Sequence, residues 1–224
     1  MLLAKTLKQN TTDVKMSRTS LGQKLIYSDF ENLAVELTGW RTDPELSEAE
    51  RIKGSGLVLG FVKGLRLSAR LIYALRKSLS EFPVDVDWGH LLDLNEDSIS
   101  PECDIIVHHK GIIQEWNGSN KPVMDFKFIQ CNHAIAIINC KSHLTSIDKT
   151  YYSRLKPYVE HILLFAECCT LGKTEALKRR AQKVGYTGLW HLYSFERDTG
   201  TAVNEPKEWK DFLITLKKIC LKKT

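Results

Sequence analysis

The stretch that most constrains the fold is residues 134–140, which read Ala-Ile-Ala-Ile-Ile-Asn-Cys with almost no alternation of apolar and polar side chains. A strand that faces solvent on one side alternates, whereas a strand buried on both faces is continuously apolar. Residues 103–107 form a second run of this kind. The two runs predict central strands of a sheet that helices cover on both sides.

Helix and strand patterns surround these two runs. Apolar residues at helical spacing predict a long helix over residues 57–82, which Pro83 ends. Further helices are predicted at 146–159, 173–184 and 206–221, and further strands at 84–94, 161–166 and 188–195. The order of a helix, three strands, a helix and another strand is typical of an α/β fold built on a central mixed β-sheet.

The N-terminal part of the chain has a different character. Residues 28–38 and 45–53 predict two short helices, and glycines at positions 54, 56 and 60 mark a change of pattern. We therefore expect a helical N-terminal arm at residues 1–53 and one domain at residues 54–224. A chain of 224 residues, 43% of them hydrophobic, can bury a single substantial core.

The apolar runs are too short for secretion or membrane insertion. No stretch approaches the roughly 20 apolar residues of a membrane span, and no N-terminal run is long enough for a signal peptide. The six cysteines lack the paired spacing of zinc sites or of a secreted disulfide framework. We therefore expect a cytoplasmic protein with reduced, mostly buried thiols and no membrane contact.

The net charge of +5 is unevenly distributed along the chain. Residues 170–224 contain twelve Lys or Arg against six acidic residues, so the C-terminal helices carry the positive excess. Such a segment is either a surface that faces phosphates or a solvated basic face with no ligand, and charge alone leaves both interpretations open.

Three short motifs carry a resemblance to a known family. They are Trp88-Gly89-His90, the segment 100–107 with Asp104 near its end, and the segment 136–142, where Asn139 and Lys141 stand two residues apart. Residues 57–166 resemble the core of the PD-(D/E)xK, or restriction-endonuclease-like, nuclease superfamily, and are most similar to an uncharacterised bacterial branch of it. The resemblance implies that family's α/β core, with helices flanking the sheet.

The resemblance also implies a catalytic site. Asp104 would be a metal ligand, and Asn139 and the main-chain carbonyl of Cys140 would complete the ligand set for Mg²⁺ or Mn²⁺. Lys141 would position the attacking water and neutralise charge that develops on the phosphate. Because alternate residues of a strand share a face, Asn139 and Lys141 should project together towards Asp104 while the Cys140 side chain points away.

The chain departs from the family pattern at two places. Asn139 stands where the pattern has an acidic residue, and the helix predicted at 57–82 contains no glutamate before its last two positions. An amide oxygen brings no negative charge, so Mg²⁺ affinity should fall unless another acid compensates. Glu102, Asp87 and Asp93 are the candidates for that role. As alternatives, Asp104 is a turn or capping residue and Lys141 is a solvated edge lysine.

Basic residues beyond the motif are candidates for contact with nucleic acid. Arg154 and Lys156 lie on the helix after the motif, where solvent exposure is the alternative interpretation, and Lys178, Arg179 and Arg180 lie on the next, basic helix. We expect a metal-dependent nuclease that acts on DNA in bacterial defence or restriction. The alternative is a cleavage-deficient relative that binds nucleic acid or a protein partner. Homodimer formation, or docking of a partner through the N-terminal arm, is also open.

Overall fold

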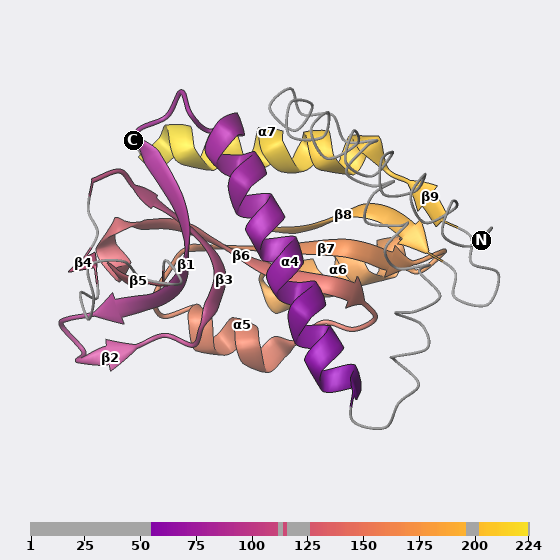
Figure 1. Ribbon diagram of the computed structural model, residues 1–224, viewed down its shortest axis with the longest axis horizontal. Coiled ribbons are helices and arrows are strands. Elements are labelled where there is room, and N and C mark those ends of the chain that lie inside the picture. The colour runs from indigo at the N-terminus through magenta and orange to yellow at the C-terminus, as the bar shows by residue number, and fades with distance from the viewer. Residues whose placement is uncertain (1–54, 112–113, 116–125, 196–201, 224) are drawn as a thin grey trace, which may run out of the picture.

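The structure is a computed structural model that describes residues 55–111, 114–115, 126–195 and 202–223 (Figure 1). The helices predicted in the N-terminal arm lie outside these residues. The described helices are α4 (Ser55–Ser78), α5 (Lys149–Leu155), α6 (Thr174–Val184) and α7 (Pro206–Lys223), with a 3-10 turn η1 (Cys131–His133). Within these residues, no helix is both long and apolar enough to cross a membrane.

One sheet runs through the described part of the chain. Its nine strands include eight in the order β4-β5-β1-β3-β6-β7-β8-β9, and β2 pairs with β1 at the side. The strands are β1 (Val84–Asp93), β2 (Ser98–Ile99), β3 (Cys103–His109), β4 (Gln114–Glu115), β5 (Phe126–Gln130), β6 (Ala134–Leu144), β7 (His161–Thr170), β8 (Gly188–Phe195) and β9 (Ala202–Asn204). Strand β3 is antiparallel to β1 and β6, whereas β6, β7 and β8 are mutually parallel, so the predicted mixed sheet is confirmed.

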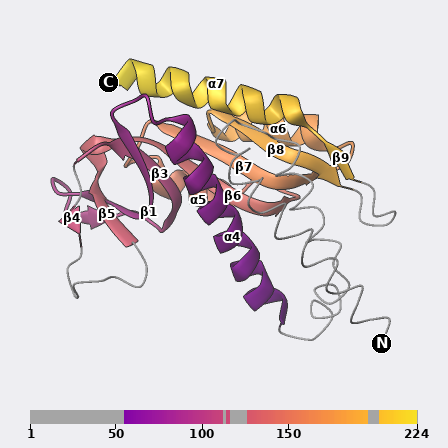
Figure 2. The same ribbon diagram turned by 45° about the horizontal axis from the view of Figure 1, so that its top comes forward.

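Helices cover both faces of this sheet. Helices α4 and α7 lie on one face and α5 and α6 on the other (Figures 1 and 2). On the central strands, Ile105 and Ile138 belong to the core under α4 and α7, and Ile106 and Ile137 belong to the core under α5 and α6. The continuous apolar runs of β3 and β6 thus reflect burial on both faces, as predicted.

Several element boundaries differ from the predicted ones. Helix α5 is shorter than expected because it begins only after Asp148, whose side chain accepts a hydrogen bond from the Tyr151 N–H, and ends before Pro157. Strands β6 and β7 each continue about four residues further than predicted. That extension carries both strands beyond Lys141, so the motif residues lie inside β6 rather than at its end.

Strand β5 has no counterpart in the predicted pattern, and it pairs in parallel with β1 through a glycine contact. Gly89 has a φ of +145°, and a Cβ atom there would lie 1.9 Å from the Lys127 carbonyl oxygen. The register of β1 against β3 also shifts between Asp87 and Gly89. Only glycine permits this conformation and this approach, so Gly89 is where β1 bends and still accommodates β5.

Candidate functional site

The pairing of β3 with β6 brings the two motif segments together. Ile105 pairs with Ile138 in antiparallel register, so the next step along the ladder places Asp104 opposite Asn139. The Asp104 carboxylate accepts a hydrogen bond of 2.8 Å from the backbone N–H of Cys140. A carboxylate and an amide that are far apart in the sequence therefore share one side of the sheet.

The side chain of Cys140 points to one face of the sheet, whereas its backbone N–H is directed towards Asp104 on β3. Its thiol is buried in the core under α4 and α7, where burial raises its pKa well above the ordinary value. Its N–H points towards Asp104, and the carbonyl of a strand residue points to the same neighbouring strand as its N–H. The Cys140 carbonyl is therefore directed to the Asp104 side.

Asn139 is fully buried on the α5 and α6 face, and its amide orientation is set by Tyr186. The Tyr186 hydroxyl donates to the Asp148 carbonyl at 3.1 Å, so its oxygen can only accept from the Asn139 Nδ2, 3.4 Å away. This arrangement turns the Asn139 Oδ1 to the other side, where it has no hydrogen-bond partner among the described residues. A buried carbonyl oxygen without a partner is costly, and such an atom is suited to bind a ligand.

Lys141 lies over the ring of Tyr151, with its Nζ 5.6 Å from the ring centroid. The Tyr151 hydroxyl donates a 2.7 Å hydrogen bond to the carbonyl of Glu102, close to Asp104 in the chain. Burial, with a smaller contribution from the Asp104 charge, raises the pKa of Tyr151, so its ring remains a neutral phenol. Tyr151 thus holds the lysine by a cation–π contact and ties α5 to the start of β3.

The electrostatics of Asp104 are those of a poorly compensated carboxylate. Burial raises its pKa, and although the Cys140 N–H and the Lys141 charge act in the opposite direction, the raised value persists. The neighbouring Glu102 charge raises it further. A partly buried acid with a perturbed pKa, beside an acceptor that has no partner among the described residues, is typical of a functional site.

Two of the three acids considered as compensation have other partners. Asp87 accepts hydrogen bonds from Arg76 and His108, and Asp93 accepts from the backbone of the turn that follows β1. Glu102 is exposed next to the site. Helix α4 contains no acidic residue, and within the described ranges no group of three or more His, Cys, Asp or Glu can hold a metal ion. Any cation site here therefore depends on Asp104 with neutral oxygen ligands.

Four of the five basic residues predicted to contact nucleic acid are exposed, and the fifth, Lys178, forms an ion pair. Arg154, Lys156, Arg179 and Arg180 are not buried, but the Lys178 ammonium lies 2.5 Å from the Glu208 carboxylate on α7. Consecutive residues of a helix point about 100° apart, so positions 178–180 cannot all face one ligand. Lys178 is already neutralised by its ion pair, and only the other four residues remain available to phosphates.

Tyr186 is the site residue that sequence reasoning missed. It follows Gly185, which ends α6 in the left-handed conformation with a φ of +116°. A Cβ atom on Gly185 would lie 2.3 Å from the Tyr152 hydroxyl, and the Tyr152 and Tyr186 rings pack with centroids 4.9 Å apart. A glycine after a basic helix was the available signal, but it indicates a helix end and not the contact with Asn139.

Comparison with known proteins adds to this geometry. No protein-family model and no curated protein matches the chain. Among solved structures, NucC from P. aeruginosa ATCC27853 in its cAAA-bound form matches with a TM-score of 0.52 and 14% identity, over 91% of this chain and 91% of NucC. The cAAA-bound form of NucC from E. coli MS115-1 matches with a TM-score of 0.52 and 11% identity, over 87% and 89%.

The chain has the restriction-endonuclease-like fold. The likeness to NucC extends over most of both chains, and the mixed sheet between two helical layers is the architecture that the motifs predicted. At this level of identity the likeness establishes the fold alone. The activity has to be argued from the residues of the site.

Proposed function

We propose that this protein is a metal-dependent nuclease that acts on DNA in bacterial defence. The observation that carries the proposal is the buried Oδ1 of Asn139, which has no partner among the described residues. It lies on the same side of the sheet as the raised-pKa carboxylate of Asp104 and the Lys141 amine. A fold whose core serves only as a scaffold has no need of three such groups on one face. The likeness to NucC supports the fold in which these groups are placed.

The oxygen atoms of the site fit a hard divalent cation. Asp104 would supply the charged ligand, and the Asn139 Oδ1 and the Cys140 carbonyl would supply neutral ones, for Mg²⁺ or Mn²⁺. Such a cation, when bound, stabilises negative charge on the phosphate and lowers the pKa of water. A positive charge beside Asp104 would also offset the burial that raises the pKa of that carboxyl.

Lys141 would provide a positive charge that the protein holds in a fixed position. Its amine is held over Tyr151, and Tyr151 is fixed by its hydrogen bond to the Glu102 carbonyl. In this position the lysine would orient a water molecule towards the phosphorus and neutralise the charge that develops on the phosphate oxygens. Tyr186 would keep the Asn139 carbonyl oxygen directed into the site.

The rest of the chain supports binding of the substrate. We propose that residues 54–224 form the nuclease domain and that Arg154, Lys156, Arg179 and Arg180, none of them buried, contact nucleic-acid phosphates. The N-terminal arm at residues 1–53 would dock on a second copy or on a partner protein.

Cleavage of plasmid and linear DNA with Mg²⁺ or Mn²⁺ tests the proposal. Asp104→Ala and Lys141→Ala should each lower the rate by about 10³-fold, because each removes a group that stabilises the transition state. Asp93→Ala, which removes an acid from the end of β1, is the matched control and should cut as wild type does. Metal-independent cleavage, or cleavage that survives both Asp104→Ala and Lys141→Ala, would overturn the assignment.

A second candidate function follows from Asn139 itself. A site with one carboxylate, and without an acid on α4, binds Mg²⁺ more weakly than a site with two, so a protein that binds nucleic acid without cutting it is the alternative. Asn139→Glu decides between the two. If wild type is inert and Asn139→Glu cuts, the chain is a disabled nuclease, and if neither cuts, the catalytic assignment is wrong.

A further inference from the structure

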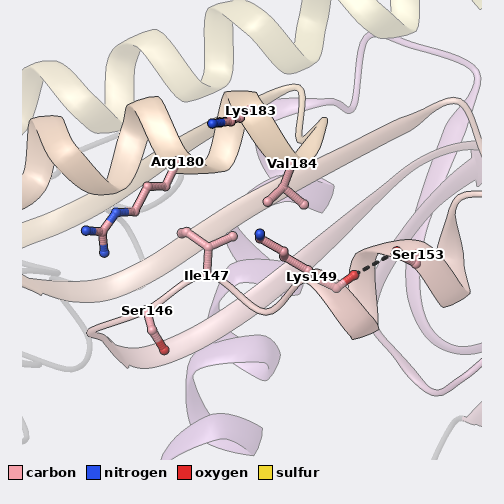
Figure 3. Close-up of a pocket in the computed structure, with 7 residues that line it drawn as sticks. All are labelled: Ser146, Ile147, Lys149, Ser153, Arg180, Lys183 and Val184. Atoms are coloured by element: carbon pink, nitrogen blue, oxygen red, sulfur yellow. Dashed lines mark hydrogen bonds between the residues drawn. The ribbon is translucent and has the colours of Figure 1, made fainter.

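A cavity of about 620 Å³ lies between the beginning of α5 and the last turns of α6 (Figure 3). Three cations line it, Lys149 from α5 and Arg180 and Lys183 from α6, and no carboxylate does. In the part of the chain that the structure describes, none of the three forms an ion pair. The cavity therefore concentrates positive charge that nothing described in the protein neutralises.

The arrangement of these cations is not what helix electrostatics alone would produce. Lys183 lies in the last turn of α6, where a cation is favourable, but Lys149 lies in the first turn of α5, where the helix dipole disfavours it. Figure 3 shows Lys149 and Arg180 reaching from different helices to either side of Ile147. An anion in the cavity would therefore meet positive charge from both helices.

The cavity is physically connected to the candidate catalytic site. The Tyr186 hydroxyl donates to the carbonyl of Asp148, which lies between the cavity residues Ile147 and Lys149. The same hydroxyl accepts from Asn139. The loop that forms one wall of the cavity is thus one hydrogen bond away from the residue that holds the Asn139 amide.

We propose that this cavity binds a phosphate group of the nucleic-acid strand whose neighbouring segment lies at Asp104 and Lys141. This inference rests on the proposed nuclease function, because the strand is the substrate. Arg180 and the two lysines contact phosphate oxygens and no base edge, so the site adds affinity and holds the position of the strand without sequence preference. Ile147 and Val184 provide an apolar surface between the charges.

Binding of a fluorescent 20-base-pair DNA duplex, measured by anisotropy in EDTA at several salt concentrations, tests the proposal without cleavage. The full chain is compared with the triple variant Lys149→Ala, Arg180→Ala and Lys183→Ala. Each phosphate that the protein no longer neutralises should reduce the slope of log K against log salt by about 0.9, so the triple variant should lose about 0.9 for the phosphate that the cavity holds. Affinity at low salt should fall at least tenfold.

The matched control removes three exposed charges from the opposite face of the sheet. It combines Lys207→Ala, Lys210→Ala and Lys218→Ala on α7. This variant has the same net charge as the cavity variant, so equal reductions in the two would show that only the overall charge matters and would overturn the site. Arg180→Lys keeps the charge and should retain most of the slope.

Calorimetric titration with ATP in EDTA distinguishes a strand phosphate from a free nucleotide. Saturable ATP binding that the cavity variant abolishes, with an unchanged duplex affinity, would overturn the proposal in favour of a nucleotide site.

The experiments also distinguish a failure of the cavity inference from a failure of the proposed nuclease function. If wild type binds DNA through the cavity but does not cut with Mg²⁺, the cavity inference stands and the catalytic one fails. If wild type cuts and the cavity variant binds DNA as wild type does, the catalytic assignment stands and the cavity inference fails.

Discussion

Two aspartates on adjacent strands of this sheet, the buried Asp87 and the partly buried Asp104, have opposite surroundings. Asp87 on β1 has both carboxylate oxygens occupied, one 2.5 Å from the Arg76 guanidinium and the other 2.9 Å from the His108 Nε2. Burial alone would raise the pKa of Asp87, but the hydrogen bond from His108 and the charge of Arg76 lower it below its ordinary value. Asp87 is a satisfied part of the core.

Asp104 on β3 is partly buried, and its charge is incompletely compensated by its neighbours. Its pKa is raised, its neighbour Asn139 has a carbonyl oxygen without a partner among the described residues, and the nearby positive charge of Lys141 is held over Tyr151. The contrast shows that burial alone does not identify a functional acid. What distinguishes the two aspartates is how far the protein itself neutralises the charge.

The two aspartates should differ most in their effect on the rate of DNA cleavage. Asp104→Asn should lower the rate of DNA cleavage by about 10³-fold, whereas Asp87→Asn should leave the rate per folded molecule unchanged. The measurement is an initial rate with Mn²⁺, corrected for the folded fraction by circular dichroism. Equal reductions of the rate in the two variants would mean that Asp87 also acts at the site.

For the free energy of unfolding, in contrast, substitution of Asp87 should have the larger effect. Asp87→Ala leaves the fully buried His108 without its carboxylate partner, and an unsatisfied buried hydrogen-bonding group costs about 1–3 kcal/mol of unfolding free energy. Asp104→Asn, which removes an uncompensated charge, should not destabilise the fold. Urea unfolding in EDTA measures both, and a destabilisation of Asp104→Asn comparable to that of Asp87→Ala would contradict the comparison.

A smaller effect on stability and on Mn²⁺ affinity tests whether Tyr186 orients the Asn139 amide. Tyr186→Phe removes the hydroxyl between Asn139 and the Asp148 carbonyl, which should cost about 1–2 kcal/mol of stability. It also releases the Asn139 amide, so Mn²⁺ affinity should fall several-fold. Tyr193→Phe, which removes a hydroxyl that donates to Glu167 at 2.7 Å, is the control. It should be less stable than wild type without any change in Mn²⁺ affinity.

The smallest effect is the pH dependence of stability. The lowered pKa of Asp87 gives stability that is present above the ordinary value of 3.8 and is lost as the pH falls through the folded-state value. The advantage of wild type over Asp87→Asn should therefore shrink below about pH 3.8. The raised pKa of Asp104 has the opposite sign, so the relative stability of Asp104→Asn should grow as the pH rises above 3.8. Unfolding curves from acidic to neutral pH, in EDTA, measure both trends.

Much of the architecture could be predicted because it follows from local patterns. The doubly buried strands β3 and β6, the helix that Pro83 follows, and the strand at 188–195 all have periodicities that a short window of sequence contains. Strand β5 could not be predicted in this way, because its pairing depends on a glycine contact with β1, far away in the chain. The ion pair of Lys178 with Glu208 could not be predicted either, because Glu208 lies on α7, 30 residues further along the chain.

The sequence by itself determined that Asp104 and the Asn139–Lys141 pair lie on two buried strands, since side chains two residues apart in a strand share a face. Only the tertiary structure decided that Asp104 is poorly compensated while Asp87 is neutralised, that Tyr186 orients the Asn139 amide, and that Lys149 and Arg180 line one cavity. These properties depend on contacts between residues far apart in the chain. Burial, charge and hydrogen-bond partners come from such contacts, and no local pattern encodes them.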